Sequence, residues 1–535
     1  MKKLAIIFLA IATIGTGCKK FTENINTNTN QPTVVTPDVV LAAGLSGTAA
    51  RLGTAFFNTN RWMGYMARSG NFIQTIPTET YAIDPGYADG DFQNIYGVLT
   101  RFNYIEHNSA GDPFYIGVAK VMKAFYFSTL VDGFNNIPYS QAFNLAQFPT
   151  PKYDDAQGIY NDLILQIDSS VTYFQNAQTK YYPTAAATSL TTDDLHDIMF
   201  GRGTGGADKA SAVARLNLWI RFANTVKLRL LMTERAAVTA SYIHTELAKC
   251  TANGQGYIGA NQSATVNPGY SNNSAAQQNP FYGSFVLTSG SANNNASFYR
   301  ANQYFINYGN DNNDYRYTDI YGTVGGTWAG NYDGDPAAAS NTNTSGIRTG
   351  GGLLVGSTQD EFIIPDFESL FLQAEAVQEG YTEVSTKTAA QLVRTANEQS
   401  FIFVDDTGTG DPAADATDAD GYMDGQAGDP DVDVAAGGLQ AIMTQKWSAL
   451  AGVNWEQAYT DYRRTGYPIP DGTNFGFSHN PAVIQHSSPD VTGKAQSVNL
   501  PYRYLYPQSE VSTNSKNIPA GTTAYTTIFW DKREK

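Results

Sequence analysis

Three segments of the chain combine aromatic side chains with neighbouring amide or charged side chains. They are 60–72, 279–282 and 327–332, the last of them in a glycine-rich stretch. A sugar ring has a C–H face that stacks on an aromatic ring, and its hydroxyl groups hydrogen-bond to amides and carboxylates. We therefore predict a ligand-binding site that draws on Trp62, Tyr65, Phe72, Phe281, Tyr282, Trp328, Asn331 and Tyr332.

Each tryptophan in these segments also has a structural interpretation. Trp62 and Tyr65 are spaced like residues on one helix face, which favours a core position for Trp62. Trp328 has no helical face to bury, and the alternative to ligand binding there is a loop anchor that packs on the rest of the protein. The other tryptophans that follow apolar helical stripes, or lie next to them, are assigned to the core: Trp219, Trp447 and Trp455.

Two charged residues lie inside apolar helical runs. Arg229 follows Lys227-Leu228, and Glu375 lies in Leu372-Gln-Ala-Glu-Ala376. A lone buried charge is costly unless it is paired or hydrogen-bonded. We predict that Arg229 and Glu375 are structural residues that form an ion pair, with each other or through hydrogen bonds between helices.

The segment from Asp405 to Asp433 contains ten Asp and no Lys or Arg. Three of them, Asp418, Asp420 and Asp424, have the oxygen ligands that Ca²⁺ prefers, but their spacing does not match the Asp-x-Asp-x-Asp-Gly calcium loop. The alternative is a solvated acidic loop, which we favour. No other cofactor is indicated by the sequence.

Enzyme motifs are weak or missing. The run Gly201-Arg-Gly203-Thr-Gly-Gly206 fits Gly-x-Gly-x-x-Gly by letter, but no β-branched strand precedes it. The five histidines are scattered without metal-ligand spacing. A secreted glycoside hydrolase stays open as an alternative, because its two catalytic carboxylates carry no local signature.

The N-terminus has the features of a bacterial lipoprotein signal. Lys2 and Lys3 precede the apolar run 4–14, and the small residues 15–17 precede Cys18. We expect cleavage after residue 17 and acylation of Cys18, although Gly15 stands where Leu is usual, and an ordinary secretory signal is the alternative. The expected division is a signal peptide (1–17), an acylated cysteine with a polar tether (18–37) and one domain (38–535).

Composition narrows the class of partner. The formal net charge is −15, only 16% of residues are charged, and 13% are aromatic. An acidic chain without a Lys/Arg-rich run is a poor match for phosphate backbones, so nucleic acid binding is disfavoured. Once Cys18 is acylated, Cys250 is the remaining thiol, so no internal disulfide is expected and packing must stabilise the fold.

Helices must position these side chains. Apolar residues recur at three- and four-residue steps in five windows, which lie within 113–132, 154–171, 216–230, 363–377 and 439–450. Long polar stretches, chiefly 251–352 and 405–433, show no regular pattern and are expected to be irregular. The sequence therefore predicts a mainly α-helical domain with long loops.

An ordered series of segments resembles the SusD/RagB nutrient-binding lipoproteins of Bacteroidetes. It begins with Cys18 and the Asn-rich tether and covers nearly the whole mature chain. Its further members are 130–142 (LVDGFNNIPYSQA), 151–160 (PKYDDAQGIY), 219–229 (WIRFANTVKLR), 372–380, Lys446-Trp447, 462–468 (YRRTGYP) and 502–510 (YRYLYPQSE). Within Asp314-Tyr315-Arg316, Tyr315 departs from the family pattern, which leads us to expect Pro.

The resemblance implies a tetratricopeptide-like α-α superhelix whose long irregular loops form a ligand-binding face. It also implies a lipid-anchored protein of the outer membrane, at the cell surface, that acts without catalysis as a lid on a SusC-type TonB-dependent transporter. The implied ligand is an oligosaccharide. A peptide ligand is the first alternative, and an outer-membrane scaffold without a ligand is another.

Overall fold

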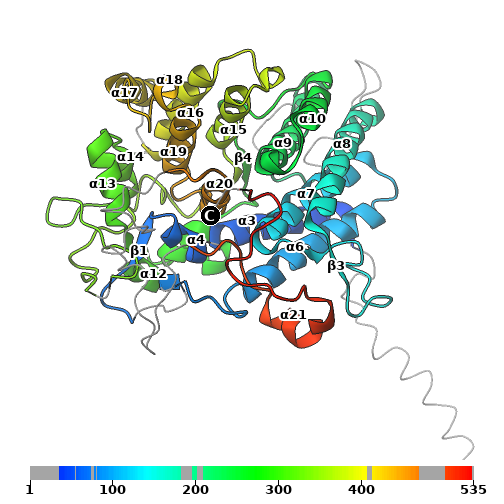
Figure 1. The fold of residues 1–535 in the computed structure, drawn as a ribbon, viewed down its shortest axis with the longest axis horizontal. Helices are drawn as coiled ribbons and strands as arrows, with labels where there is room; N and C mark the ends of the chain where they lie inside the picture. Colours follow the sequence, from blue (N-terminus) through cyan, green and yellow to red (C-terminus); the bar gives the residue numbers. More distant parts are fainter. Residues whose placement is uncertain are drawn as a thin grey trace, which may run out of the picture.

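The computed structural model of the chain describes residues 35–532 apart from 55, 74–77, 80, 182–195, 202–208, 336, 406–411 and 469–499. The expected signal peptide, Cys18 and nearly all of the tether lie outside the described residues. The described part is mainly helical, and three small two-stranded sheets accompany the helices (Figure 1).

The first group of helices packs in chain order. Neighbouring members contact each other, from α3 with α6 through α6 with α7 and α7 with α8 to α8 with α9. This side-by-side stacking of successive helices is the α-α arrangement that the family resemblance implies (Figure 1). The group comprises α3 (Pro37–Thr54), α6 (Asp89–Asn108), α7 (Pro113–Phe134), α8 (Ala156–Tyr181), α9 (Lys209–Thr233) and α10 (Ala240–Ala252).

The second group follows the irregular middle of the chain. Helix α15 joins it to the first group, because α15 contacts α9 as well as α16 and α19. The group comprises α15 (Asp366–Gln378), α16 (Ala389–Val404), α17 (Pro412–Gly425), α18 (Val434–Gly437), α19 (Leu439–Ala449) and α20 (Trp455–Thr465).

Short elements fill the remaining segments. The strands pair antiparallel as β1 (Met66–Arg68) with β5 (Tyr299–Ala301), β2 (Ile137–Pro138) with β3 (Tyr153–Asp154), and β4 (Ala264–Val266) with β6 (Glu361–Ile364). The short helices are α4 (Phe56–Trp62), α11 (Pro280–Phe285), α12 (Asn294–Phe298), α13 (Gln303–Asn312), α14 (Arg316–Ile320) and α21 (Gln508–Thr513), with 3₁₀ turns η1 (Arg235–Ala237), η2 (Ala275–Gln277), η3 (Thr382–Val384) and η4 (Ser515–Asn517).

Helix α7 shows how local sequence sets these elements. Asp112 caps it by accepting a hydrogen bond from the Phe114 N–H, and Pro113 occupies the first turn, where its missing N–H costs nothing. Among the described residues, α7 is the one helix long and apolar enough to cross a membrane, but 78% of its most apolar window is buried. It is the central core helix of this group.

All five predicted helical windows contain a helix, but two expectations fail. Ile363 belongs to strand β6, so α15 begins only at Asp366. The two stretches expected to be irregular both contain regular elements: α17 lies within 405–433, and β4, β5 and α11 to α14 lie within 251–352. On α17, Asp418 and Asp424 are exposed and Asp415 is buried, while Ala419 and Tyr422 pack against Phe401 of α16.

One continuous cluster of buried apolar side chains runs through both groups of helices. Trp219, Trp447 and Trp455 belong to it, as the sequence predicts. Cys250 is buried near the end of α10, where it packs as a small apolar residue.

Candidate ligand-binding face

The β1–β5 pair brings the predicted aromatic segments together. Ser69 and Gly70, just after β1, donate hydrogen bonds to the carbonyl oxygens of Phe298 and Ala339. Asn331 donates to the carbonyl oxygen of Arg68 at 3.0 Å, so the third segment lies against the first. The second segment forms α11, which contacts α12 just before β5. These loops form one face on the side of α12 and β1 (Figure 1).

Trp62 and Tyr65 are core residues, and the prediction that they offer a surface to a ligand is wrong. Each is only 1% exposed. Trp62 stacks on Tyr87 at 5.5 Å, and its indole N–H donates to the carbonyl oxygen of Thr78 at 2.9 Å. Tyr65 stacks on Trp447 at 5.5 Å and donates to its carbonyl oxygen. Tyr65 fixes the chain just before β1, and Trp62 fixes it at Thr78, beyond the loop that follows β1.

Asn331 and Phe281 are also buried, contrary to the prediction of direct ligand contact. The Asn331 amide group bonds Arg68 and both backbone groups of Ala339, which saturates it. Phe281 is 5% exposed and forms part of the wall of a hollow of about 410 Å³ together with Phe362 and Phe403. Sequence alone misplaces these residues because an aromatic or amide side chain in a loop is equally suited to anchoring that loop.

The other four predicted residues are half-buried. Phe72 contacts Phe298 edge to face, with 5.1 Å between ring centroids. Tyr282 is in the first turn of α11, and the Tyr332 hydroxyl contacts the Asn307 amide at 3.2 Å. Trp328 donates from its indole to the carbonyl oxygen of Tyr321 and packs edge to face on Tyr317, so it does anchor its loop while part of the ring stays exposed.

We call Asn71, Phe72, Phe298 and Asn341 the loop patch. The Asn341 backbone N–H donates to the Asn71 side-chain oxygen at 2.7 Å, and the Phe72 and Phe298 rings lie beside them. All four side chains retain exposed surface. The patch thus offers two aromatic rings and two amide groups, which suits an uncharged hydroxylated ligand.

Buried ion pairs lie beneath the surface of the loop patch and hold its loops together. Glu79 accepts from Arg61 and from Arg68, each at 2.7 Å, and Asp333 accepts from Arg61 at 2.7 Å. Arg61 also lies over the Phe298 ring, 5.7 Å from its centroid. Burial raises the pKa of Asp333, although Arg61 opposes that shift. These charges join segments far apart in the sequence, and they hold the loops rather than face a ligand.

Sequence reasoning missed Phe298, Asn341 and this set of ion pairs. Phe298 ends an Asn-rich run and precedes Tyr299, which is a weak signal of the same kind as that used for Phe72. The pairing of Arg61 with Asp333 spans 272 residues and leaves no local trace in the sequence.

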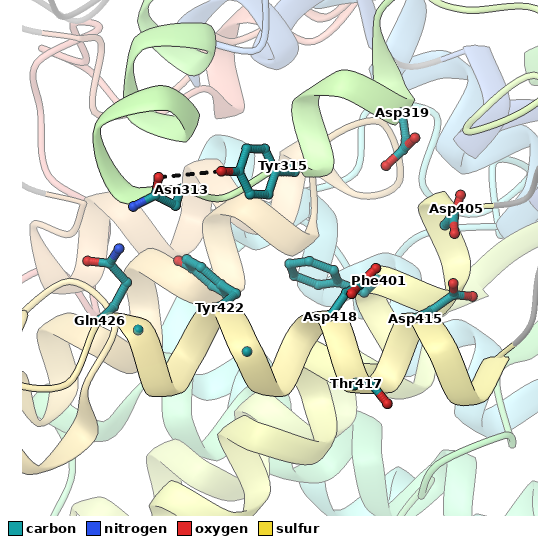
Figure 2. A pocket seen from close by; sticks show the side chains of 12 residues that line it. Asn313, Tyr315, Asp319, Phe401, Asp405, Asp415, Thr417, Asp418, Tyr422 and Gln426 are labelled. Carbon is teal, nitrogen blue, oxygen red and sulfur yellow. Dashed lines mark hydrogen bonds between the residues drawn. The ribbon is translucent and has the colours of Figure 1, made fainter.

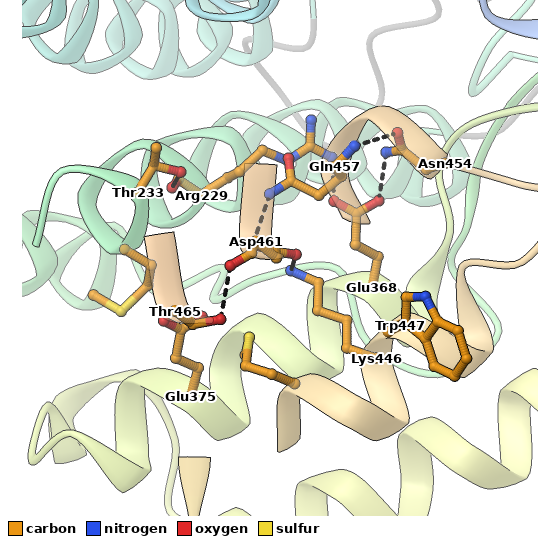
Figure 3. A network of polar contacts seen from close by, with 12 residues as sticks. Arg229, Thr233, Glu368, Glu375, Lys446, Trp447, Asn454, Gln457, Asp461 and Thr465 are labelled. Carbon is orange, nitrogen blue, oxygen red and sulfur yellow. Dashed lines mark hydrogen bonds and ion pairs between the residues drawn. The ribbon is translucent and has the colours of Figure 1, made fainter. Parts of the chain in front are cut away.

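Arg229 and Glu375 each form a buried ion pair, but with other partners than each other. Arg229 pairs with Glu368, and Glu375 accepts from both terminal nitrogens of Arg464. Asp461 contacts Arg464 at 2.7 Å and Lys446 at 2.8 Å. Gln457 and Asn454 connect Asp461 to Glu368 by hydrogen bonds (Figure 3). We call the six charged residues, Arg229, Glu368, Glu375, Lys446, Asp461 and Arg464, the scaffold network; it joins α9, α15, α19 and α20.

The calcium candidates do not converge. Asp420 and Asp424 are four residues apart on α17 and both pair with Arg394 of α16. Asp418 lies on the wall of a hollow of about 600 Å³ between α14, α16 and α17. A guanidinium group therefore occupies the place that a cation would need beside Asp420 and Asp424, and the described residues contain no His/Cys/Asp/Glu group suited to a metal ion.

Comparison with known proteins gives a consistent result. A SusD-like family model, described as starch-binding and associating with the outer membrane, matches residues 29–507. No curated protein sequence matches the chain.

Several solved structures have the same fold. A chitin-binding SusD homologue from Flavobacterium johnsoniae superposes with a TM-score of 0.68 at 20% identity, over 92% of this chain and 99% of that one. A SusD-like protein from Bacteroides thetaiotaomicron gives a TM-score of 0.68 at 18% identity, over 93% and 99%. A SusD homologue from Bacteroides uniformis gives 0.66 at 20% identity, over 92% and 99%.

Proposed function

Because the chain belongs to the SusD-like family, whose members bind ligands and are not enzymes, we propose that it captures an oligosaccharide at the outer membrane. In this proposal it delivers the glycan to a SusC-type TonB-dependent transporter and closes over that transporter as a lid. The observation that carries the proposal is the loop patch, with its two partly exposed rings beside two amide groups.

The chemistry of the loop patch favours a neutral glycan. Its rings can stack on the C–H face of a sugar, and its amides can bond hydroxyl groups in either direction. Arg61 and Arg68 are committed to the buried ion pairs, and Arg300 donates to the carbonyl oxygens of Ala296 and Thr344, so these cations are already engaged within the protein. The name of the F. johnsoniae relative supports a glycan as the ligand class.

The anchoring part of the proposal rests on the sequence. Acylation of Cys18 would hold the protein on the outer leaflet, and the polar tether would allow the domain to move relative to the membrane. Radiolabelled palmitate incorporated into the wild type and not into Cys18→Ala would support it. Release of the wild-type protein into the medium without lipid would contradict it.

The ligand is tested by calorimetric titration against neutral glycans, anionic glycans and peptides. We expect saturable binding of a neutral glycan and no product after prolonged incubation. Product formation would show an enzyme, and binding of peptides alone would show the alternative ligand.

The site is tested by Phe72→Ala combined with Phe298→Ala. Loss of both aromatic rings should weaken glycan binding at least tenfold, which is equivalent to about 1.4 kcal/mol of binding free energy. The helical circular dichroism spectrum should not change. Tyr315→Ala, which removes another exposed aromatic ring, is the matched control and should bind the neutral glycan normally. Equal affinity in the double variant and the wild type would exclude the loop patch.

A further inference from the structure

A long groove follows one face of helix α6, while α3 and α7 pack on its other sides. The groove has a volume of about 860 Å³ and is lined by α6 from Phe92 to Asn108, by the segment 138–151 and by α21. Figure 1 shows α21 and β3 next to α6 on this side of the molecule. We call it the α6 groove. The loop patch uses none of its residues.

Aromatic and apolar side chains form much of the walls of the α6 groove. Tyr96 and Phe143 lie side by side, with 6.2 Å between ring centroids. Leu145 is 65% exposed, and Pro149 and Pro151 continue the same wall. An exposed apolar surface shared by several residues marks a place where a partner binds.

The polar part of the lining is almost uncharged. Thr100, Thr513 and Asn514 contribute hydroxyl and amide groups. Among the described lining residues Glu510 is the one carboxylate, and none is Lys or Arg. Glu510 already accepts hydrogen bonds from the Tyr153 hydroxyl at 2.9 Å and from the Asn514 amide at 3.0 Å. The α6 groove therefore suits an uncharged occupant with both apolar and amide side chains.

The chain enters the described structure at one end of the α6 groove. The Tyr104 hydroxyl donates a hydrogen bond to the carbonyl oxygen of Val35 at 2.8 Å, and Tyr104 lines the groove near the C-terminal end of α6. Ser509 marks the opposite end, where its backbone N–H donates to Asp89 in the first turn of α6. The tether is thus attached where the groove begins. Docking of its last residues is intramolecular, with an effective concentration on the order of millimolar.

The residues just before Val35 match the α6 groove in chemistry and in order. Residues 26–34 read Asn-Thr-Asn-Thr-Asn-Gln-Pro-Thr-Val and carry no charge. Pro32 and Val34 are nearest in sequence to the Tyr104 end, and proline-containing extended segments pack well on aromatic rings. The Asn/Thr part comes next and would reach toward the hydroxyl and amide groups of α21, with which amide side chains can bond as donors and acceptors.

We propose that residues 28–34 of the tether bind in the α6 groove as an extended segment. From Phe92 to Asn108 α6 is about 24 Å long. That length accommodates about seven extended residues. The tether from Cys18 to Val35 spans at most about 60 Å when extended, and the part left free after docking spans at most about 35 Å. Docking therefore shortens the distance that the domain can move from a membrane to which Cys18 is anchored.

The experiment uses the mature full chain with Cys18→Ser, in which Cys250 is buried. Thr29→Cys is combined with Thr100→Cys, at an exposed position that lines the α6 groove. The matched control combines it with Thr179→Cys, at an exposed position near the end of α8 outside the groove. A short bismaleimide is added, and mass spectrometry of the digest measures the rate of cross-linking.

We expect the pair with Thr100→Cys to cross-link at least tenfold faster than the pair with Thr179→Cys. A docked segment holds residue 29 beside α6, whereas an undocked tether meets both positions by diffusion. Equal rates in the two pairs, or a faster reaction in the control pair, would overturn the proposal.

Substitutions in the tether test which residues dock. Pro32→Ser combined with Val34→Ser should slow the reaction of the pair with Thr100→Cys to the rate of the control pair. Phe21→Ser combined with Ile25→Ser also removes two apolar side chains, but nearer to Cys18, and should leave the rate unchanged. If only the second combination slows the reaction, a different segment occupies the groove and the proposal is wrong. All four substitutions lie outside the packed domain, so unfolding does not explain a slower reaction.

Other occupants of the α6 groove would give different results. In a mixture of two chains, one with Thr29→Cys and one with Thr100→Cys, cross-links between the chains would show the tether of a second copy. Protection of Thr100→Cys from a maleimide by a neutral glycan, with equal rates in the two cross-linking pairs, would show a second sugar site. Either result would overturn the proposal, and neither depends on the loop patch.

Discussion

The scaffold network and the hollow between α14, α16 and α17 (Figure 2) both carry several charged side chains, but the charges are paired differently. The network pairs three cations, Arg229, Lys446 and Arg464, with three anions, Glu368, Glu375 and Asp461, and all six are almost completely buried. The hollow, of about 600 Å³, has Asp319, Asp405, Asp415 and Asp418 on its walls, and Arg348 contacts Asp319 at 3.1 Å.

The difference indicates what each region is for. Buried charges that are matched one to one stabilise a particular packing of helices, and removing one of them strands its partner. Carboxylates that share a partly open cavity repel each other, so they cost stability unless something positive joins them. In this protein the first pattern belongs to the helical scaffold and the second to the open hollow beside Tyr315.

The largest effect should follow from breaking the scaffold network. Glu375→Ala removes one of the two carboxylates that pair with the buried Arg464 guanidinium, and only Asp461 is left beside it. We therefore expect a loss of about 3–5 kcal/mol in the free energy of unfolding. Urea denaturation at pH 7 measures it. Asp424→Ala, a substitution on the exposed surface of α17, is the control and should change little.

A further variant tests whether the charges or only the packing matter. Arg464→Met combined with Glu375→Leu removes the pair and replaces it with apolar atoms, and Asp461 keeps Lys446 as a partner. We expect the double variant to be more stable than Glu375→Ala. If Glu375→Ala retains full stability, the network is not structural and the comparison fails.

Glu234 is a buried carboxyl group that does not belong to the scaffold network, and we expect its substitution to have the next largest effect on stability. It is fully buried after the end of α9, and within the described part of the chain neither of its carboxyl oxygens has a hydrogen-bond partner. Burial, with a smaller contribution from Glu246, raises its pKa to about 8. The folded state therefore retains a proton that the unfolded state releases above about pH 4.5, and this residue lowers stability progressively as the pH rises from about 4.5 to 8.

Glu234→Gln should remove that pH dependence. Glutamine stays neutral, so the stability of the variant should match that of the wild type near pH 5. Near pH 8 the variant should be more stable by a few kcal/mol, which is the order of magnitude that this pKa shift implies. Thermal melts across this range measure the difference. Parallel curves for the two proteins would show that Glu234 is ionised in the folded state.

The sequence predicts the scaffold well and the sites less well. Apolar periodicity locates α7, α8, α9, α15 and α19 because each buries a stripe against its neighbours. Helix α17 escapes that reasoning, since its core contact involves little more than Ala419 and Tyr422.

The sites depend on contacts between distant residues. The sequence predicts that Arg229 and Glu375 need partners, but Glu368 and Arg464 are brought to them only by the fold. The same limit applies to the aromatic residues. Trp62 and Phe72 both lie in the segment 60–72 that suggested a sugar platform, yet Trp62 is buried against Tyr87 and Phe72 is only half-buried.

The hollow should respond to charge removal in the opposite direction from the network. Burial, with a contribution from Asp405, raises the pKa of Asp319 to about 6, although Arg348 opposes the shift. Asp319→Asn should therefore stabilise the protein slightly at pH 7.5, by under about 1 kcal/mol because the side chain is partly solvated, and should have no such effect at pH 4. Chemical denaturation at the two pH values tests this. A destabilised variant at pH 7.5 would mean that Asp319 serves the scaffold through Arg348.

The smallest effect belongs to the ion pairs on the outside of α17. Arg394 bonds Asp420 and Asp424, and the three side chains are 37%, 45% and 70% exposed. Water and salt screen such pairs, so Arg394→Ala should cost only about 0.2–1 kcal/mol, and less in 0.5 M sodium chloride. The same melts with calcium or a chelator should be superimposable for the wild type. A loss near that of Glu375→Ala, insensitive to salt, would mean that α17 is held by charge rather than by its apolar contact with Phe401, and the distinction between matched buried pairs and exposed ones would not hold here.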